Sequence, residues 1–241
     1  MVIVVSGANG GMGRAISTAL LDRKVGVVAC YRNMTSDFSE WIKYAQDSYG
    51  ALINVERLDL GSNESAKSDA KRIIENYEVQ GLVNNAALAA GSLFMMTPEK
   101  RLKEVFEVNF FSTIQVSQVI AKSMIKNSKG RIVNVSSISG HFSSRGFLSY
   151  GASKAALDYA TKIMAEELAM YGITVNSVAP GLTETPMLDE MEEDKKEWFR
   201  QLSFSKKFSR PDELANLVTY LLLDSPSQLT GQVISLNGGM P

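Results

Sequence analysis

The sequence has few of the side chains that bind metal ions or cross-link a chain. Its 241 residues include one cysteine, Cys30, and one histidine, His141. A single cysteine excludes an internal disulfide and fits a reducing compartment. Zinc sites draw mainly on cysteine and histidine, so we expect no metal cofactor.

Long apolar runs and an excess of one charge are also absent. The chain has 25 lysine and arginine residues against 26 aspartate and glutamate residues, a net charge of −1. Without a long basic run, a nucleic acid partner is disfavoured. No apolar run reaches the length of a membrane span, and the opening VIVV is too short for a signal-peptide core. We therefore expect a cytoplasmic protein with neither a membrane nor a nucleic acid partner.

Short apolar runs alternate with longer helical patterns along the whole chain. The predicted strands are residues 2–6, 25–31, 52–58, 81–86, 131–137, 173–179 and 232–236, and the clearest helices are 12–23, 65–78 and 211–224. Several strands are rich in Val and Ile nearly throughout, as parallel strands covered on both faces are. No linker or internal repeat is visible. The pattern predicts one α/β domain over residues 1–241, with a doubly wound parallel seven-stranded sheet and helices on both faces.

A glycine-rich loop, SGANGGMGRA at residues 6–15, joins the first predicted strand to a helix. Gly7, Gly11 and Gly13 follow the spacing G-x-x-x-G-x-G. Glycines allow a tight turn and a close approach of the backbone to a pyrophosphate, which the helix N-terminus attracts. A glycine turn without any ligand has the same composition, so the loop alone leaves both interpretations open.

The end of the second predicted strand bears on the choice of cofactor. NAD-binding folds usually place an acid there, whereas a nearby arginine accommodates the 2′-phosphate of NADP. Here Tyr31 stands where an acid is expected, and Arg32 follows it. This favours NADP, although an arginine at a strand end can also be simply solvated.

Tyr150 and Lys154 are four residues apart in SYGASKAALDYATK (149–162) and share one helix face. A phenol normally keeps its proton until about pH 10, and a nearby ammonium group lowers that pKa. Such a spacing is common on surface helices. The pair alone therefore does not distinguish packing from chemistry.

Several motifs, in the same order along the chain, resemble those of the short-chain dehydrogenase/reductase family. They are SGANGGMG (6–13), DL (59–60), NNAA (84–87), Asn109 in VNFFST, IVNVSSISG (132–140), Tyr150 with Lys154, and PGLTETPM (180–187). Ser6 replaces the usual Thr, and Ala87 replaces the usual Gly. The resemblance extends over essentially the whole chain. Residues 173–187 and 211–240 are most similar to bacterial 3-oxoacyl-acyl-carrier-protein reductases.

The resemblance implies a Rossmann-type fold and an NADPH-dependent ketoreductase. Tyr150 would protonate the substrate carbonyl, Lys154 would lower the tyrosine pKa and bind the nicotinamide ribose, Ser137 would hydrogen-bond the carbonyl oxygen, and Asn109 would hold a water. The implied contacts to NADP(H) are Gly7, Asn9, Gly11, Met12, Gly13, Arg32, Asp59, Leu60, Asn85, Ala86, Tyr150, Lys154, Pro180, Gly181 and Thr185. It also implies a homotetramer.

The substrate stays open at this point. A 3-oxoacyl thioester on acyl carrier protein or CoA is favoured, but the positions where such reductases often carry carrier-docking arginines hold Ser128 and Tyr171. Another carbonyl or alcohol (a polyketide-type intermediate, sugar, steroid or quinone) is the alternative. A catalytically idle NADP-binding protein is less favoured, because it has no need for the proton-delivery residues.

The segment at about 185–208 lies where the family has its substrate loop. Its apolar residues recur at helical spacing, so it is either a lid over an acyl chain or an amphipathic helix packed on the domain. Phe142, Phe147 and Leu148 are candidates for lining the substrate pocket. His141 is assigned no role.

Overall fold

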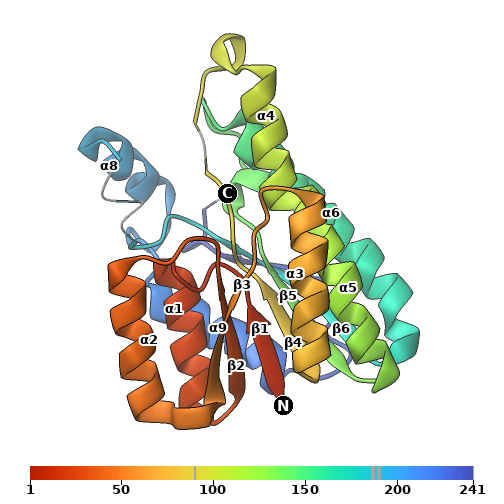
Figure 1. Ribbon diagram of the computed structural model, residues 1–241. Coiled ribbons are helices and arrows are strands. Elements are labelled where there is room, and N and C mark those ends of the chain that lie inside the picture. The colour runs from red at the N-terminus through yellow and green to blue at the C-terminus, as the bar shows by residue number, and fades with distance from the viewer. Residues whose placement is uncertain (90, 186–187, 189–190, 241) are drawn as a thin grey trace.

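The computed structural model contains a single parallel sheet with helices on both of its faces (Figure 1). The structure describes residues 1–89, 91–185, 188 and 191–240. In this part of the chain the sheet has seven strands in the order β3-β2-β1-β4-β5-β6-β7. The strands are β1 (Val2–Val5), β2 (Gly26–Tyr31), β3 (Ile53–Arg57), β4 (Val79–Asn84), β5 (Gly130–Val135), β6 (Ile173–Pro180) and β7 (Val233–Leu236). The predicted doubly wound parallel sheet is confirmed.

Two groups of helices cover the sheet. On one face lie α1 (Gly11–Asp22), α2 (Ser36–Tyr49) and α9 (Pro211–Leu223), and on the other lie α3 (Asn63–Asn76), α5 (Ser112–Lys126) and α6 (Leu148–Leu168) (Figure 1). Each face has its own hydrophobic core. Because the central strands are covered on both sides, every residue of β6 is buried.

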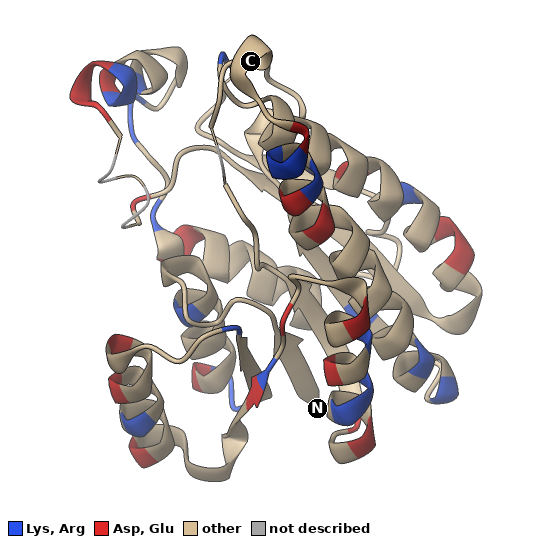
Figure 2. Ribbon diagram, turned by 45° about the horizontal axis from the view of Figure 1, so that its top comes forward, with Lys and Arg blue, Asp and Glu red and all other residues tan. Residues whose placement is uncertain are grey.

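Two shorter helices, α4 (Glu99–Phe106) and α8 (Glu193–Leu202), extend beyond the carboxyl ends of the strands (Figure 1). Basic and acidic residues are mixed on the outer helices, including α8 (Figure 2). Among the described residues, no helix combines the length and apolar composition needed to cross a membrane.

Polar side chains inside the fold connect the sheet to its helices. Asn84 Nδ2 donates to Asn134 Oδ1 and to Ser117 Oγ on α5, both at 2.8 Å. Asn134 Nδ2 donates to Thr161 Oγ1 on α6, also at 2.8 Å. A buried amide needs such partners, because it has lost its hydrogen bonds to water. Asn134 is fully buried and thus joins β4, β5 and α6.

Replacement of this amide should destabilise the fold. In Asn134→Ala, an N–H of Asn84 loses its acceptor and Thr161 loses a donor, so we expect the free energy of unfolding to fall by about 2–3 kcal/mol. Urea unfolding measures this change. Asn127→Ala, which alters an exposed asparagine bound to Glu78, is the control and should change little. Equal stability of the two variants would contradict the role of Asn134.

Candidate active site

A cleft of about 540 Å³ lies at the carboxyl ends of the strands and collects many of the predicted cofactor residues. Those that line it are Gly7, Asn9, Gly11, Met12, Gly13, Arg32, Leu60, Asn85, Ala86, Tyr150 and Thr185. Asp59, Lys154, Pro180 and Gly181 do not line it. Pro180 is the last residue of β6, and Gly181 packs against Asn237. In α/β sheets of this kind, ligands bind outside the carboxyl ends of the strands.

The glycine loop is packed too tightly for larger residues. Gly7 has φ +64°, and a Cβ built on it would lie 2.8 Å from Ala86 Cα. A Cβ on Gly13 would lie 2.2 Å from the carbonyl oxygen of Gly7. Ser6 Oγ accepts hydrogen bonds from the backbone N–H groups of Asn85 and Ala86, each at 3.0 Å. Glycine at these positions thus lets the loop close on the end of β4.

Unpartnered polar atoms in the cleft fit a dinucleotide ligand. The side-chain atoms Asn85 Oδ1 and Arg14 Nε are buried without a hydrogen-bond partner in the described structure. Helix α1 begins at the loop and has no acidic residue in its first turn, so its N-terminus is open to an anion. We propose that the pyrophosphate of NADP(H) binds there.

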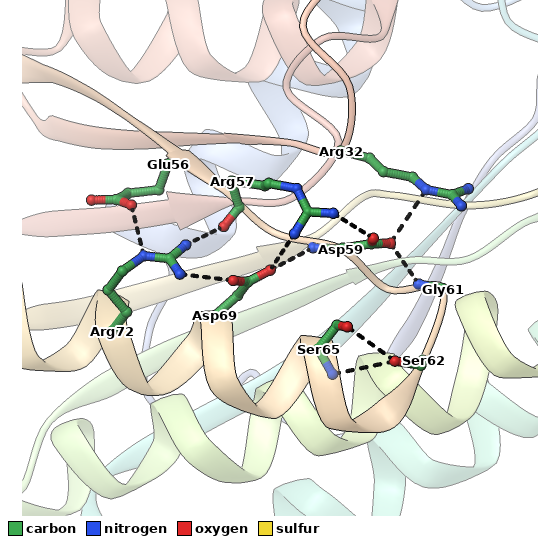
Figure 3. A network of polar contacts seen from close by, with 9 residues as sticks. All are labelled: Arg32, Glu56, Arg57, Asp59, Gly61, Ser62, Ser65, Asp69 and Arg72. Atoms are coloured by element: carbon green, nitrogen blue, oxygen red, sulfur yellow. Dashed lines mark hydrogen bonds and ion pairs between the residues drawn. The ribbon is translucent and has the colours of Figure 1, made fainter.

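Arg32 belongs to an ion-pair network at the rim of the cleft (Figure 3). Its Nε lies 3.2 Å from Asp59 Oδ1, and Arg57 Nη2 lies 2.7 Å from Asp59 Oδ2. Asp59 also accepts from the backbone N–H of Gly61 at 2.9 Å. The carboxylate of Asp59, which we expected to contact NADP(H), instead holds two arginines. Arg32 remains 61% exposed, and we propose that it meets the 2′-phosphate.

Arg14 lines the same cleft and was missed by the sequence analysis. Its Nη2 donates to the carbonyl oxygen of Asn9 at 3.0 Å and contacts the carboxylate of Asp37. Hydrogen bonds from Thr35 and Arg14 lower the pKa of Asp37 to about 2. Arg14 could have been predicted as a cleft residue from the sequence, because it is a basic residue in the first helical turn after the glycine loop.

Asn109 is positioned by an irregular turn between α4 and α5. Residues Glu107–Phe111 form a π-helical turn, and Asn109 is buried within it. Its Oδ1 accepts from the N–H of Leu88 at 2.7 Å. Its Nδ2 donates to Leu88 O at 3.1 Å and to Ser153 Oγ at 3.0 Å. The side chain thus ties the segment after β4 to α6.

Ser137 and Tyr150 meet at the end of β5. Ser137 is the residue before a 3₁₀ turn, Ile138–Gly140, and its Oγ accepts from the N–H of Ser139 at 3.1 Å. Burial raises the pKa of Tyr150, and the hydrogen bond with Ser137 opposes that shift. A raised pKa keeps the phenol protonated, which is the form that a proton donor requires.

Lys154 lies one turn after Tyr150 and is buried. Its Nζ donates to the carbonyl oxygen of Val135 at 2.7 Å and lies 5.8 Å from the centre of the Tyr150 ring. Burial lowers the pKa of Lys154 to about 8, and the carboxylate of Asp158 acts in the opposite direction. We expected Lys154 to lower the tyrosine pKa. Here its ammonium contacts a backbone carbonyl, while the partial burial of Tyr150 raises the tyrosine pKa.

Apolar space adjoins this site. One cavity, of about 750 Å³, is lined by residues 93–96 and 139–148, which include Phe142, Phe147 and Leu148. Another, of about 590 Å³, extends to Lys195 and Trp198 on α8. Phe199 of α8 is buried, while Trp198 packs against Phe142. Met187, in the predicted substrate loop, lies outside the described residues. The described residues contain no cluster of three or more His, Cys, Asp or Glu that suits a metal ion.

Comparison with known proteins identifies the family. The short chain dehydrogenase family matches residues 1–196. Three proteins named 3-oxoacyl-(acyl-carrier-protein) reductase FabG each match 99% of this chain. They come from Thermotoga maritima (31% identity, 97% of its length), Aquifex aeolicus (34%, 96%) and Escherichia coli (32%, 96%).

Solved structures agree in architecture. A candidate gluconate dehydrogenase from Agrobacterium tumefaciens has a TM-score of 0.93 at 24% identity, over 99% of this chain and 95% of that one. A candidate NAD(P)-dependent gluconate 5-dehydrogenase from Beutenbergia cavernae, solved with bound NADP, has a TM-score of 0.93 at 27% identity, over 99% and 96%.

The chain therefore belongs to the short chain dehydrogenase family. It is an NADP-dependent oxidoreductase that acts on CH–OH or C=O groups.

Reversal of the charge of Arg32 should weaken NADPH binding selectively. In Arg32→Asp, the loss of a charged contact to the 2′-phosphate should raise the Kd for NADPH about 10- to 100-fold and leave that for NADH little changed. Calorimetric titration with both cofactors measures this. Arg23→Asp, whose arginine pairs with Asp224 on the surface, is the control. Equal losses for NADPH and NADH would remove Arg32 from the phosphate site.

Proposed function

We propose that the protein is an NADPH-dependent ketoreductase that converts a 3-oxoacyl thioester, linked to acyl carrier protein or CoA, into the 3-hydroxyacyl product. The observation that carries this proposal is the hydrogen bond between Ser137 and Tyr150, with the buried Lys154 one turn further along α6. Of these three residues, Tyr150 lines the 540 Å³ cleft. The relatives named 3-oxoacyl-acyl-carrier-protein reductase support the substrate class.

The side chains divide the chemistry between them. NADPH supplies the hydride when it is bound. Tyr150 donates its phenolic proton to the carbonyl oxygen, and Ser137 donates a hydrogen bond to the same oxygen and stabilises its developing charge. Lys154 keeps a positive charge near the phenol and holds the nicotinamide ribose. Asn109 provides the water through which the tyrosine regains its proton.

The space beside the site suits an apolar acyl chain. Phe142, Phe147 and Leu148 line the larger cavity, and an acyl chain there would replace water on their surfaces. We propose residues 185–208, which include α8, as the substrate loop over this space.

A carrier protein would dock on few basic groups. Lys126, Lys129 and Arg131 lie near the position of Ser128 and are candidates to attract an acidic carrier. Arg131, however, is tied by hydrogen bonds to Thr174 Oγ1 at 2.9 Å and to the carbonyl oxygen of Ser225 at 3.1 Å. The attraction would then rest on the exposed Lys126 and Lys129.

A sugar acid is the second candidate substrate. The similarity to the candidate gluconate 5-dehydrogenase favours it, as do Arg145 and Lys195, which both line the 590 Å³ cavity and would attract a carboxylate.

We also propose a homotetramer in the cytoplasm. The resemblance implies interfaces formed by the helices that start near residues 99 and 150. Large apolar side chains are exposed on and beside these helices: Phe111, Tyr159, Ile163 and Met170. The single cysteine, Cys30, is buried and unpaired, which fits a reducing compartment.

A substrate comparison tests the proposed function. We expect NADPH oxidation, followed by its absorbance, with acetoacetyl-CoA and with acetoacetyl-acyl carrier protein, and a much slower reaction with a 5-ketogluconate substrate. If the protein prefers the carrier-linked thioester and this preference decreases in the double variant Lys126→Glu/Lys129→Glu, the result supports docking of the carrier protein on these two lysines. Rapid turnover of 5-ketogluconate, without turnover of either thioester, would contradict the proposal and support a sugar acid as the substrate.

Removal of one hydroxyl tests the mechanism. Tyr150→Phe should lower the turnover number by at least about 10²–10⁴-fold, because proton donation is lost, while NADPH still binds with nearly unchanged Kd. Tyr44→Phe, which alters an exposed tyrosine on α2, is the control and should keep full turnover. Retained turnover in Tyr150→Phe would contradict the assignment of the proton donor.

A further inference from the structure

A carboxylate is buried directly behind the proposed reactive side chains. Asp158 lies on α6 one turn after Lys154, and its side chain is only 4% exposed. Carboxylates are rarely buried unless they are paired and hydrogen-bonded, because burial removes their hydration. None of the roles proposed above uses this group.

The carboxylate of Asp158 holds three other segments of the chain. Its Oδ1 accepts from Ser177 Oγ of β6 at 2.6 Å, and its Oδ2 accepts from Ser136 Oγ at 2.7 Å. The Nε2 of His141 lies 3.0 Å from Oδ2. Ser136 and His141 flank the turn that begins at Ser137. Asp158 therefore ties that turn and β6 to the helix that carries Tyr150 and Lys154.

The packing around this carboxylate leaves little freedom. A Cβ built on Gly140, in the same turn, would lie 3.1 Å from Asp158 Oδ2 and 3.0 Å from the backbone nitrogen of Ala155. The turn thus closes directly on α6. Gly140 lies three residues after Ser137, so Asp158 packs against the turn that Ser137 precedes.

Few charges face Asp158. On its own helix, Lys154 precedes it by one turn, and the exposed Lys162 follows it by one turn. The turn after β5 contributes His141, while β5 and β6 contribute the hydroxyls of Ser136 and Ser177. Lys154 is the buried cation of this set. Asp158 and Lys154 are both buried and lie four residues apart on one face of α6. Away from water, the carboxylate favours the charged form of the lysine.

We infer that Asp158 is a positioning residue for the proposed reaction, which keeps Lys154 in its ammonium form and fixes the turn that carries Ser137. The inference rests on the proposed role of Lys154. His141 is the solvent-facing partner of this carboxylate, and a permanent positive charge at its position would offset the field of Asp158 at Lys154.

Asp158→Asn tests the inference, because it keeps the shape of the side chain and removes its charge. Without the carboxylate, Lys154 should lose its proton at a pH lower by about one pH unit. NMR titration of the ¹³C-lysine-labelled protein without ligands measures this shift. The Lys154 signal is identified by its absence from the spectrum of Lys154→Arg. The alkaline fall in NADPH-linked turnover should move to lower pH together with it.

Asp158→Glu restores the charge and should return both titrations towards those of the wild type. Asp224→Asn removes a surface carboxylate paired with Arg23 and should move neither. An unchanged Lys154 titration in folded Asp158→Asn would overturn the inference, even if turnover fell equally at every pH.

A second pair of variants covers the case in which Asp158→Asn does not fold. His141 is about half exposed, so replacements there should be tolerated. His141→Lys should move the Lys154 titration to lower pH, whereas His141→Gln should not. Equal titrations in these two variants would overturn the inference. If the titrations shift as expected but no thioester is reduced, Asp158 keeps its role at Lys154 and only the proposed substrate is wrong.

Discussion

Lys154 is buried with its amine 2.7 Å from the carbonyl oxygen of Val135, and the rest of the candidate site is arranged around that contact. The contact requires α6 to pack closely on the ends of β5 and β6. Asn134, through Thr161, secures this packing in the middle of the helix, and Asp158 secures it near the site. The same packing brings Tyr150, one turn earlier on α6, to Ser137. The packing of α6 on the sheet therefore accounts both for the buried ammonium group of Lys154 and for the protonated phenol of Tyr150.

Much of this arrangement follows from local sequence patterns. The Val- and Ile-rich runs predicted all seven strands to within about two residues, since parallel strands buried on both faces need such runs. The glycine spacing predicted the closed loop. Contacts between distant segments were not predictable: the spacing of Lys154 and Asp158 was visible, but Ser136, Ser177 and His141 reach that carboxylate only through the folded sheet. The raised pKa of Tyr150 likewise depends on burial, which a single helical segment does not reveal.

The cavities that we propose for the substrate are lined by a different part of the molecule from the cleft that we propose for the cofactor. The cleft is formed by the strand ends and the glycine loop, whereas the adjoining cavities are lined by residues 91–96, 139–148 and part of α8. Loops of this kind vary without altering the sheet. This separation explains how proteins named as 3-oxoacyl reductases and candidate gluconate dehydrogenases share the architecture of this chain.

The most direct test of the account follows the hydride itself. The protein would be given NADPH that carries deuterium at the transferable position of its nicotinamide ring, together with an acetoacetyl thioester on acyl carrier protein. The account predicts a 3-hydroxybutyryl product with one deuterium on the carbon that bears the hydroxyl group, formed within a single turnover. An unlabelled hydroxyacyl product, or none while NADPH is bound, would contradict it.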